Sequence, residues 1–189
     1  MILVDTFAFF VCAVLILMLP LDWLLSGLCA AALHEVGHII AIYASGGNVL
    51  QIRIGVHGAE IRTDLRTTSQ ELCCAAAGPA VSLLLLLFCR TAPKLALCAL
   101  IQGVFNLMPV YPLDGGRMLQ CLLSWLWPKS AEWIGSVIGM IWCTLLLFLS
   151  VTAAIRKHIS LFQFLVICGV LFRLLRGNIP CKSGKIAIQ

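Results

Sequence analysis

The chain has 189 residues, of which 61% are hydrophobic and only 11% are charged. A soluble domain has about 45–50% apolar and about 25% charged residues, so a water-soluble fold could not bury this much apolar side chain. The composition therefore predicts a one-domain integral membrane protein, with room for about six spans of about 20 residues. The net charge of +5 gives no reason to expect a nucleic-acid partner, because scattered basic residues also orient membrane proteins.

Apolar stretches separated by short polar or helix-breaking segments predict an all-α polytopic membrane protein with about six transmembrane helices. Pro20 and Asp22 close the first stretch, and Ser45-Gly46-Gly47 ends the second. The predicted spans cover residues 6–20, 23–44, 72–89, 95–108, 131–153 and 159–175, each boundary being accurate to about 2–4 residues.

The stretch after the second span has a different period. In VLQIRIGV, Leu50, Ile52, Ile54 and Val56 alternate with polar or small residues, which indicates a strand. His57-Gly58 is typical of a turn, and AEIRT of a returning strand. The pattern over 49–62 predicts a small β-hairpin at the membrane edge, followed by the polar link DLRTTSQE.

The segment NLMPVYPLDGGR follows the fourth predicted span and breaks helical structure repeatedly. Pro109, Pro112 and Gly115-Gly116 all fall within it. Irregular backbone at membrane depth is tolerated only where protein or a wet cavity surrounds it. We expect a short helix to follow, from Met118 to Trp127.

Six spans would place both termini on one side of the membrane. That side would carry most of the Lys and Arg residues. The other side would carry Arg90, Lys94, Arg156 and Lys157. Positive charge gathers on the cytoplasmic side, so both termini are predicted to be cytoplasmic. The membrane domain would comprise residues 1–176, and residues 177–189 would form a short cytoplasmic tail.

The sequence AALHEVGHII places three polar side chains inside the second span. His34 and His38 are four residues apart, so they share one face of a helix and can both reach one tetrahedral zinc ion. Glu35 would lie beside the metal, where it can hold a water and take its proton. Polar residues in apolar spans mark functional sites, although a structural polar network is the alternative.

A catalytic zinc site needs a third protein ligand and one open position. Most other candidates lie at span ends or in loops; these are Asp22, Glu71, Glu132, His57 and His158. Asp114 lies between Pro112 and Gly115 on the same side as the histidine pair. A carboxylate there either completes the site or caps the next helix, and the spacing alone does not choose between these roles.

HEVGH on one span, NLMPVYPLDGGR two spans later and the intervening Gly78-Pro79 resemble the motifs of the site-2 protease family of intramembrane zinc metalloproteases, peptidase M50. The second motif is most similar to that of the branch typified by the stage IV sporulation protein FB.

The resemblance implies one Zn²⁺ per chain, with His34, His38 and Asp114 as ligands and Glu35 as the general base. It also implies that Asn106 and Pro109 help to bind the substrate backbone. From the residues alone, Asn106 could equally be a polar residue at a helix end. The strand segment would receive substrate by strand addition.

The implied function is cleavage of a membrane-embedded or membrane-associated protein near the cytoplasmic face of a bacterial cell membrane, as in regulated intramembrane proteolysis. Only about a dozen residues follow the last predicted span, so we do not expect the regulatory domain of the sporulation branch. Regulation would then come from a membrane partner or from substrate supply. The alternatives are a non-catalytic scaffold that binds membrane proteins and, less favoured by the clustering of polar residues, a zinc transporter.

Overall fold

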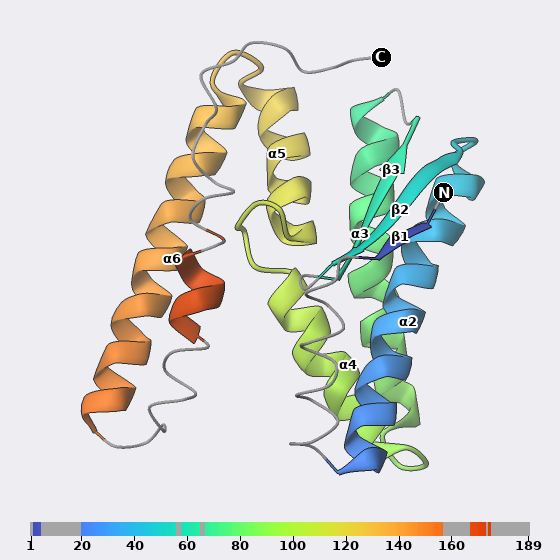
Figure 1. Ribbon diagram of the computed structural model, residues 1–189. Helices are drawn as coiled ribbons and strands as arrows, with labels where there is room; N and C mark the ends of the chain where they lie inside the picture. Colours follow the sequence, from blue (N-terminus) through green and yellow to red (C-terminus); the bar gives the residue numbers. More distant parts are fainter. Residues whose placement is uncertain are drawn as a thin grey trace. The chain divides into compact units, whose positions relative to one another are not determined.

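The computed structural model describes residues 2–4, 20–55, 58–64, 67–156, 167–172 and 174, most of which are helical (Figure 1). They fall into two compact units, one ending at Asn106 and one beginning at Leu107. The first unit contains β1 (Ile2–Val4), α2 (Leu21–Ala44), β2 (Val49–Gly55), β3 (Gly58–Thr63), α3 (Thr68–Leu84), the 3₁₀ helix η1 (Leu85–Phe88) and α4 (Pro93–Asn106). The second unit contains α5 (Asp114–Leu126) and α6 (Ala131–Ile155).

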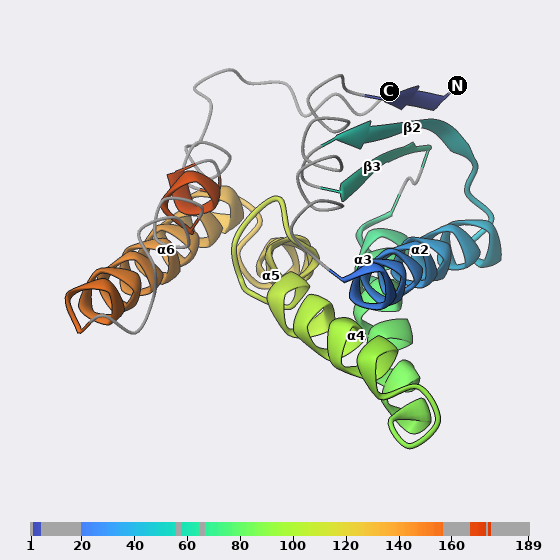
Figure 2. The ribbon, with the colours of Figure 1, turned by 60° about the horizontal axis from the view of Figure 1, so that its bottom comes forward.

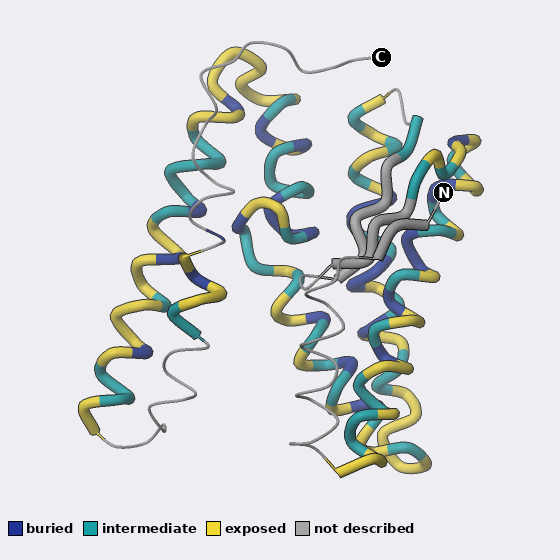
Figure 3. Tube along the Cα trace, in the orientation of Figure 1, coloured by how far each residue is buried: buried dark blue, intermediate teal, exposed yellow. Residues whose placement is uncertain are grey.

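Helix α2 corresponds to the predicted second span. It begins after Pro20, whose fixed φ suits a helix start, and ends at Ser45 before Gly46, which has a φ of 77°. Its buried positions recur at helical spacing along one face, as the dark blue bands of Figure 3 show. They are Ala30, His34, Gly37, His38 and Ile42.

The exposed face of α2 is apolar, whereas its buried face carries the two histidines. Leu25, Val36 and Ile40 are among the exposed side chains. This distribution reverses that of a soluble helix and is typical of a helix surrounded by lipid. Among the described residues, three helical segments are long and apolar enough to cross a membrane: Leu21–Ala44, Thr68–Phe88 and Ala131–Ile155.

The other predicted spans have different outcomes. The fourth corresponds to α4, which has only 14 residues and a length of about 21 Å, less than a typical hydrocarbon core. The first predicted span lies outside the described residues except for Pro20. The sixth is described only at residues 167–172 and 174, which are helical.

Three strands form one sheet in the order β1-β2-β3. β2 pairs antiparallel with β3, with Ile52 opposite Ile61, and β1 pairs parallel with β2. Figure 2 shows the sheet beside α2 and α3, with α4 on the other side of these helices. The turn at residues 56–57 is outside the described residues, so the membrane-edge hairpin stays a prediction; β1 was not predicted.

Helix α3 begins at Thr68, four residues before the predicted span, so the prediction of a polar link up to Glu71 was wrong. A capping box causes the early start: Thr67 Oγ1 accepts from Gln70 N, and Gln70 Oε1 accepts from Thr67 N. Gln70 Nε2 also donates to the Ser45 carbonyl at 2.9 Å. The polar residues thus join the end of α2 to the start of α3.

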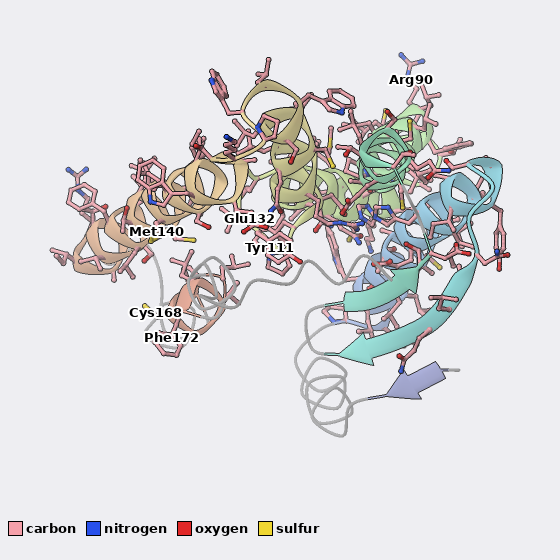
Figure 4. All side chains as sticks on the ribbon, turned by 90° about the horizontal axis from the view of Figure 1, so that it is seen from above. Arg90, Tyr111, Glu132, Met140, Cys168 and Phe172 are labelled. Carbon is pink, nitrogen blue, oxygen red and sulfur yellow. The ribbon has the colours of Figure 1, made fainter. Side chains whose placement is uncertain are left out.

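Small residues let the helices of the first unit approach closely. α2 packs against α3 and α4, which also pack against each other. A Cβ at Gly37 would lie 2.8 Å from Val81 Cγ2 and 3.0 Å from the Ala77 carbonyl oxygen. At the other end of α2, Asp22 forms an ion pair with Lys94. Arg90, in the loop before α4, points outward (Figure 4).

In the second unit, α5 begins at Asp114 rather than at the predicted Met118. Gly115 and Gly116 permit this start, because a Cβ at Gly115 would lie 2.1 Å from the Leu107 carbonyl oxygen and one at Gly116 would lie 2.4 Å from Val110 C. The two glycines therefore let the preceding loop fold directly onto the helix. α5 packs against α6, which matches the predicted fifth span. Figure 4 labels Met140 on α6 and Cys168 and Phe172 on the helical residues 167–172.

We expect Gly37→Ala to lower the melting temperature in detergent, because overpacking costs about 1–3 kcal/mol and exceeds the gain in helix propensity of about 1 kcal/mol. Gly27→Ala is the matched control on the same helix, since its Cβ would meet nothing within 4 Å. Circular dichroism on heating measures both. Equal melting temperatures would contradict the close packing of α2 on α3.

Candidate metal centre

The two histidines of HEVGH form a buried pair in the second half of α2. Only 1% of the surface of His34 and 6% of that of His38 are exposed. Their Nε2 atoms lie 3.2 Å apart, and the rings meet edge to face at an interplanar angle of 79°. The spacing of four residues therefore brings one nitrogen of each ring to the same place.

This separation fits a shared metal ion. Two nitrogens bound at about 2.0–2.1 Å to one tetrahedral ion lie about 3.3–3.4 Å apart. The observed 3.2 Å requires only a small adjustment of the rings.

Helix α3 supplies an oxygen partner for the other nitrogen of each ring. Ser82 Oγ lies 2.8 Å from His34 Nδ1, and the Cys74 carbonyl oxygen lies 2.7 Å from His38 Nδ1. A carbonyl oxygen only accepts, so His38 Nδ1 must carry the proton that it donates. In the neutral ring this leaves the Nε2 lone pair of His38 available for a metal.

Gly78 lies between these two partners, four residues from each along α3. A Cβ there would lie 2.3 Å from His38 Nε2 and 2.6 Å from His34 Nε2. Both distances are far below a van der Waals contact, and both rings are held in place at Nδ1. Only glycine therefore leaves the space in which the two nitrogens meet.

Glu35 is adjacent to the histidine pair in sequence, and Asn106 is adjacent to it in space. Glu35 is half-buried and follows His34 on α2. Asn106, the last residue of α4, places Nδ2 at 3.3 Å from His34 Nε2. The amide therefore lies at the nitrogen that a metal would take.

Two predicted site residues belong to the second unit. Pro109 is half-buried in the loop before α5. Asp114 is buried, with 7% of its surface exposed, and is the first residue of α5, whose N-cap is Leu113. Asp114 thus lies in the first turn of this helix rather than at its N-cap, and its role as a third ligand stays a prediction. His34, His38 and Asp114 are thus all buried, and each carries an atom of a kind that can bind a metal ion.

Sequence reasoning missed the partners of the histidines. Ser82 is buried in α3 and is surrounded in sequence by valine and leucine. A lone serine in such a run usually bonds to its own helix, so nothing singled it out. The spacing Cys74, Gly78, Ser82 would have shown one helical face, but not that it faces α2.

Comparison with known proteins agrees with this geometry. The model of peptidase family M50 matches residues 88–149, which include α4, α5 and Asp114. Zinc metalloprotease MJ0392 of Methanocaldococcus jannaschii is 29% identical over 109 residues, which are 50% of this chain and 32% of that protein. The protein sll0528 of Synechocystis, whose name marks it provisionally as a zinc metalloprotease, is 33% identical over 106 residues, which are 48% of this chain and 28% of that protein.

The matched segment thus covers less than a third of either relative's length. The structure of the site-2 protease from Methanocaldococcus jannaschii has the same fold, with a TM-score of 0.67, 23% identity, and coverage of 95% of this chain and 90% of that one. The matched family model and the two relatives agree with the predicted resemblance to the site-2 proteases of peptidase family M50, over part of the chain. None of them concerns the sporulation branch.

We expect Gly78→Ala to abolish metal binding at the histidine pair, because the new methyl group would occupy the space between the Nε2 atoms. Titration of the purified chain with Zn²⁺ against a chelator measures the affinity. Gly27→Ala, which adds the same methyl group in open space, is expected to bind as wild type does. Wild-type affinity in Gly78→Ala would show that the metal lies elsewhere.

Proposed function

We propose that this chain is a zinc-dependent intramembrane endopeptidase. The observation that carries the proposal is the buried histidine pair, with the Nε2 atoms 3.2 Å apart and each Nδ1 beside an oxygen of α3. Polar partners of this kind hold metal-ligating histidines in position. Such an arrangement within an apolar helix is costly unless it serves a site.

One Zn²⁺ per chain is the proposed cofactor, held by His34, His38 and Asp114. Two imidazoles and one carboxylate are typical ligands of a catalytic zinc site. The burial of all three residues and the names of the two zinc metalloprotease relatives support the assignment. When bound, zinc would polarise the scissile carbonyl and lower the pKa of a water to about 7.

The remaining chemistry belongs to the side chains around the pair. Glu35 takes a proton from the attacking water as the new C–O bond forms. It then delivers that proton to the leaving nitrogen as the peptide C–N bond breaks. The Asn106 amide, 3.3 Å from His34 Nε2, would hold the substrate backbone beside the histidine pair. Pro109 would assist from the loop before α5.

The proposed substrate is a protein embedded in or associated with the membrane, cleaved near the cytoplasmic face as in regulated intramembrane proteolysis. Its helix must unwind locally, because helical hydrogen bonds and side chains shield the peptide bond. A strand of the substrate could pair with the sheet that contains β2 and β3. A membrane partner or the supply of substrate would control the reaction.

The proposed setting is a bacterial cytoplasmic membrane. The chain would cross it about six times, with both termini cytoplasmic and the β-hairpin at the membrane edge. Residues 1–176 would form the protease domain, and residues 177–189 a cytoplasmic tail. The three long apolar helices and the shared fold with a site-2 protease support this setting.

We expect Asp114→Ala to weaken zinc binding by more than about 100-fold, since loss of a ligand costs more than the 10–100-fold typical of an outer partner. Zinc per purified chain, measured by elemental analysis after dialysis, should fall from about one to near zero. Glu132→Ala is the control, because Glu132 is also an acid in the first turn of a helix but is exposed. Unchanged zinc in Asp114→Ala would remove the third ligand and reopen the protease assignment.

We expect Glu35→Gln to lower cleavage by at least about 100-fold while zinc content stays at one per chain, because the amide cannot take the proton. The assay reconstitutes the chain in liposomes with a set of single-span reporter proteins and identifies new termini by mass spectrometry. Glu71→Gln makes the same change at an exposed position outside the site. Cleavage that persists in Glu35→Gln would refute the general-base role, and no cleavage by wild type would favour a scaffold.

A further inference from the structure

Two polar contacts join α2 to α4, one near the start of both helices and one further along them. Lys94 forms an ion pair with Asp22, and Asn106 Nδ2 lies 3.3 Å from His34 Nε2. In each contact the two residues are 72 positions apart in the sequence. The two helices therefore run parallel and keep a single register from one contact to the other (Figure 1).

This spacing determines how a shift of α4 would affect Asn106. The two contacts are twelve residues apart on each helix, which is about 18 Å along a helix axis. One residue corresponds to an axial displacement of about 1.5 Å, so a slip of α4 by a single residue would separate Asn106 Nδ2 from His34 Nε2. The position of the amide therefore depends on the register of α4 on α2.

The packed face of α4 offers little resistance to such a slip. The buried residues of this helix are Ala96, Ala99 and Gly103. Small side chains form shallow ridges, so they let helices approach closely without interlocking as larger side chains do. Polar contacts near the helix ends must therefore define the register.

The position of Lys94 suits this contact better than it suits the stability of its own helix. Lys94 is the second residue of α4, where a cation opposes the helix macrodipole, whereas Asp22 is the second residue of α2, where an acid is favourable. Trp23 N donates to Asp22 Oδ1 at 3.0 Å, while Oδ2 contacts Lys94. Lys94 Nζ also lies 5.6 Å from the centre of the Trp23 ring. A carboxylate and an aromatic ring of α2 thus hold the ammonium group of α4.

We infer that the ion pair between Lys94 and Asp22 is a positioning contact, which sets the register of α4 on α2 and so places the Asn106 amide beside His34. The inference rests on the proposed role of Asn106 in holding the substrate backbone. Both charged side chains are about half exposed, and an exposed ion pair changes an equilibrium by no more than about 5-fold. The pair therefore biases the register without being needed for the fold.

The decisive measurement is the ¹⁵N–¹H NMR spectrum of the asparagine side chains in the whole chain, labelled with ¹⁵N-asparagine, in detergent and without metal. Asn106→Gln assigns the Asn106 signals by their disappearance. Asn48, whose amide donates to Asp64 at 3.2 Å, is the internal reference. We expect Lys94→Met to move the Asn106 signals and to leave those of Asn48 in place. Asn106 signals that do not move would overturn the inference.

Three further variants separate the ion pair from other effects of removing a charge. Arg90→Met removes a cation in the loop before α4, but this side chain points outward, so the Asn106 signals should stay in place (Figure 4). Asp22→Asn keeps the shape of the carboxyl group and should move them in the same direction as Lys94→Met.

The exchange of Asp22→Lys with Lys94→Asp should restore the Asn106 signals, because both residues are second in their helices and the exchanged charges still attract. The same displacement in Arg90→Met as in Lys94→Met would overturn the inference. An exchanged chain whose signals stay as far from wild type as those of Lys94→Met would also overturn it.

Cleavage of a reporter protein gives a second readout. Lys94→Met should lower kcat/KM about 5-fold at unchanged zinc content. The same change should cost nothing further in the Asn106→Ala background, because the amide through which Lys94 acts is then absent. An equal loss in both backgrounds would show that Lys94 does not act through Asn106 and would overturn the inference.

These outcomes are separable from those that test proteolysis, because the asparagine spectra are measured without substrate or metal. Asn106 signals that move in Lys94→Met and return in the exchanged chain, without any cleavage by wild type, would refute only the protease function. Cleavage by wild type together with unmoved signals in Lys94→Met would refute only the role of the ion pair.

Discussion

The hydrogen bond between His38 Nδ1 and the Cys74 carbonyl is the interaction on which the arrangement of the site depends. An unsatisfied polar group in a hydrocarbon setting costs several kcal/mol, so each histidine of α2 must find an oxygen on a neighbouring helix. α3 provides one for each ring, from Cys74 and Ser82. These two hydrogen bonds at Nδ1 orient the rings so that both Nε2 atoms point toward each other. The candidate metal site follows from that orientation.

Close packing makes these bonds reachable. The oxygens of α3 come within 3 Å of the histidines because Gly37 and Gly78 remove side chains from the contact between α2 and α3. Lipid offers no hydrophobic driving force for helices to associate. Close packing at small residues and hydrogen bonds between helices must therefore stabilise the association. The same residues therefore stabilise the packing of the two helices and define the site. A mutation at Gly78 would disturb both at once.

The sequence predicted most of what depends on local pattern. Helical spacing identified His34 and His38, and the stop at Ser45-Gly46-Gly47 matched the end of α2. The start of α3 was missed because a capping box made the polar residues from Thr68 helical, and that of α5 because Gly115 and Gly116 allow a tight start. β1 was missed since its partner strand is distant in sequence. Ser82 could not be recognised as a partner of His34, because that contact depends on which face of α3 packs against α2.

The two histidines, although four residues apart on one helix, are not equivalent ligands. His38 faces a carbonyl oxygen that is fixed in the backbone, so its Nδ1 must carry the proton that it donates. His34 faces a hydroxyl and an amide, both of which can change their orientation. The partner of His38 therefore allows one direction of hydrogen bond, whereas the hydroxyl beside His34 allows two. This difference follows from the chemistry of two oxygens on α3, because a backbone carbonyl oxygen only accepts, whereas a serine hydroxyl can donate or accept.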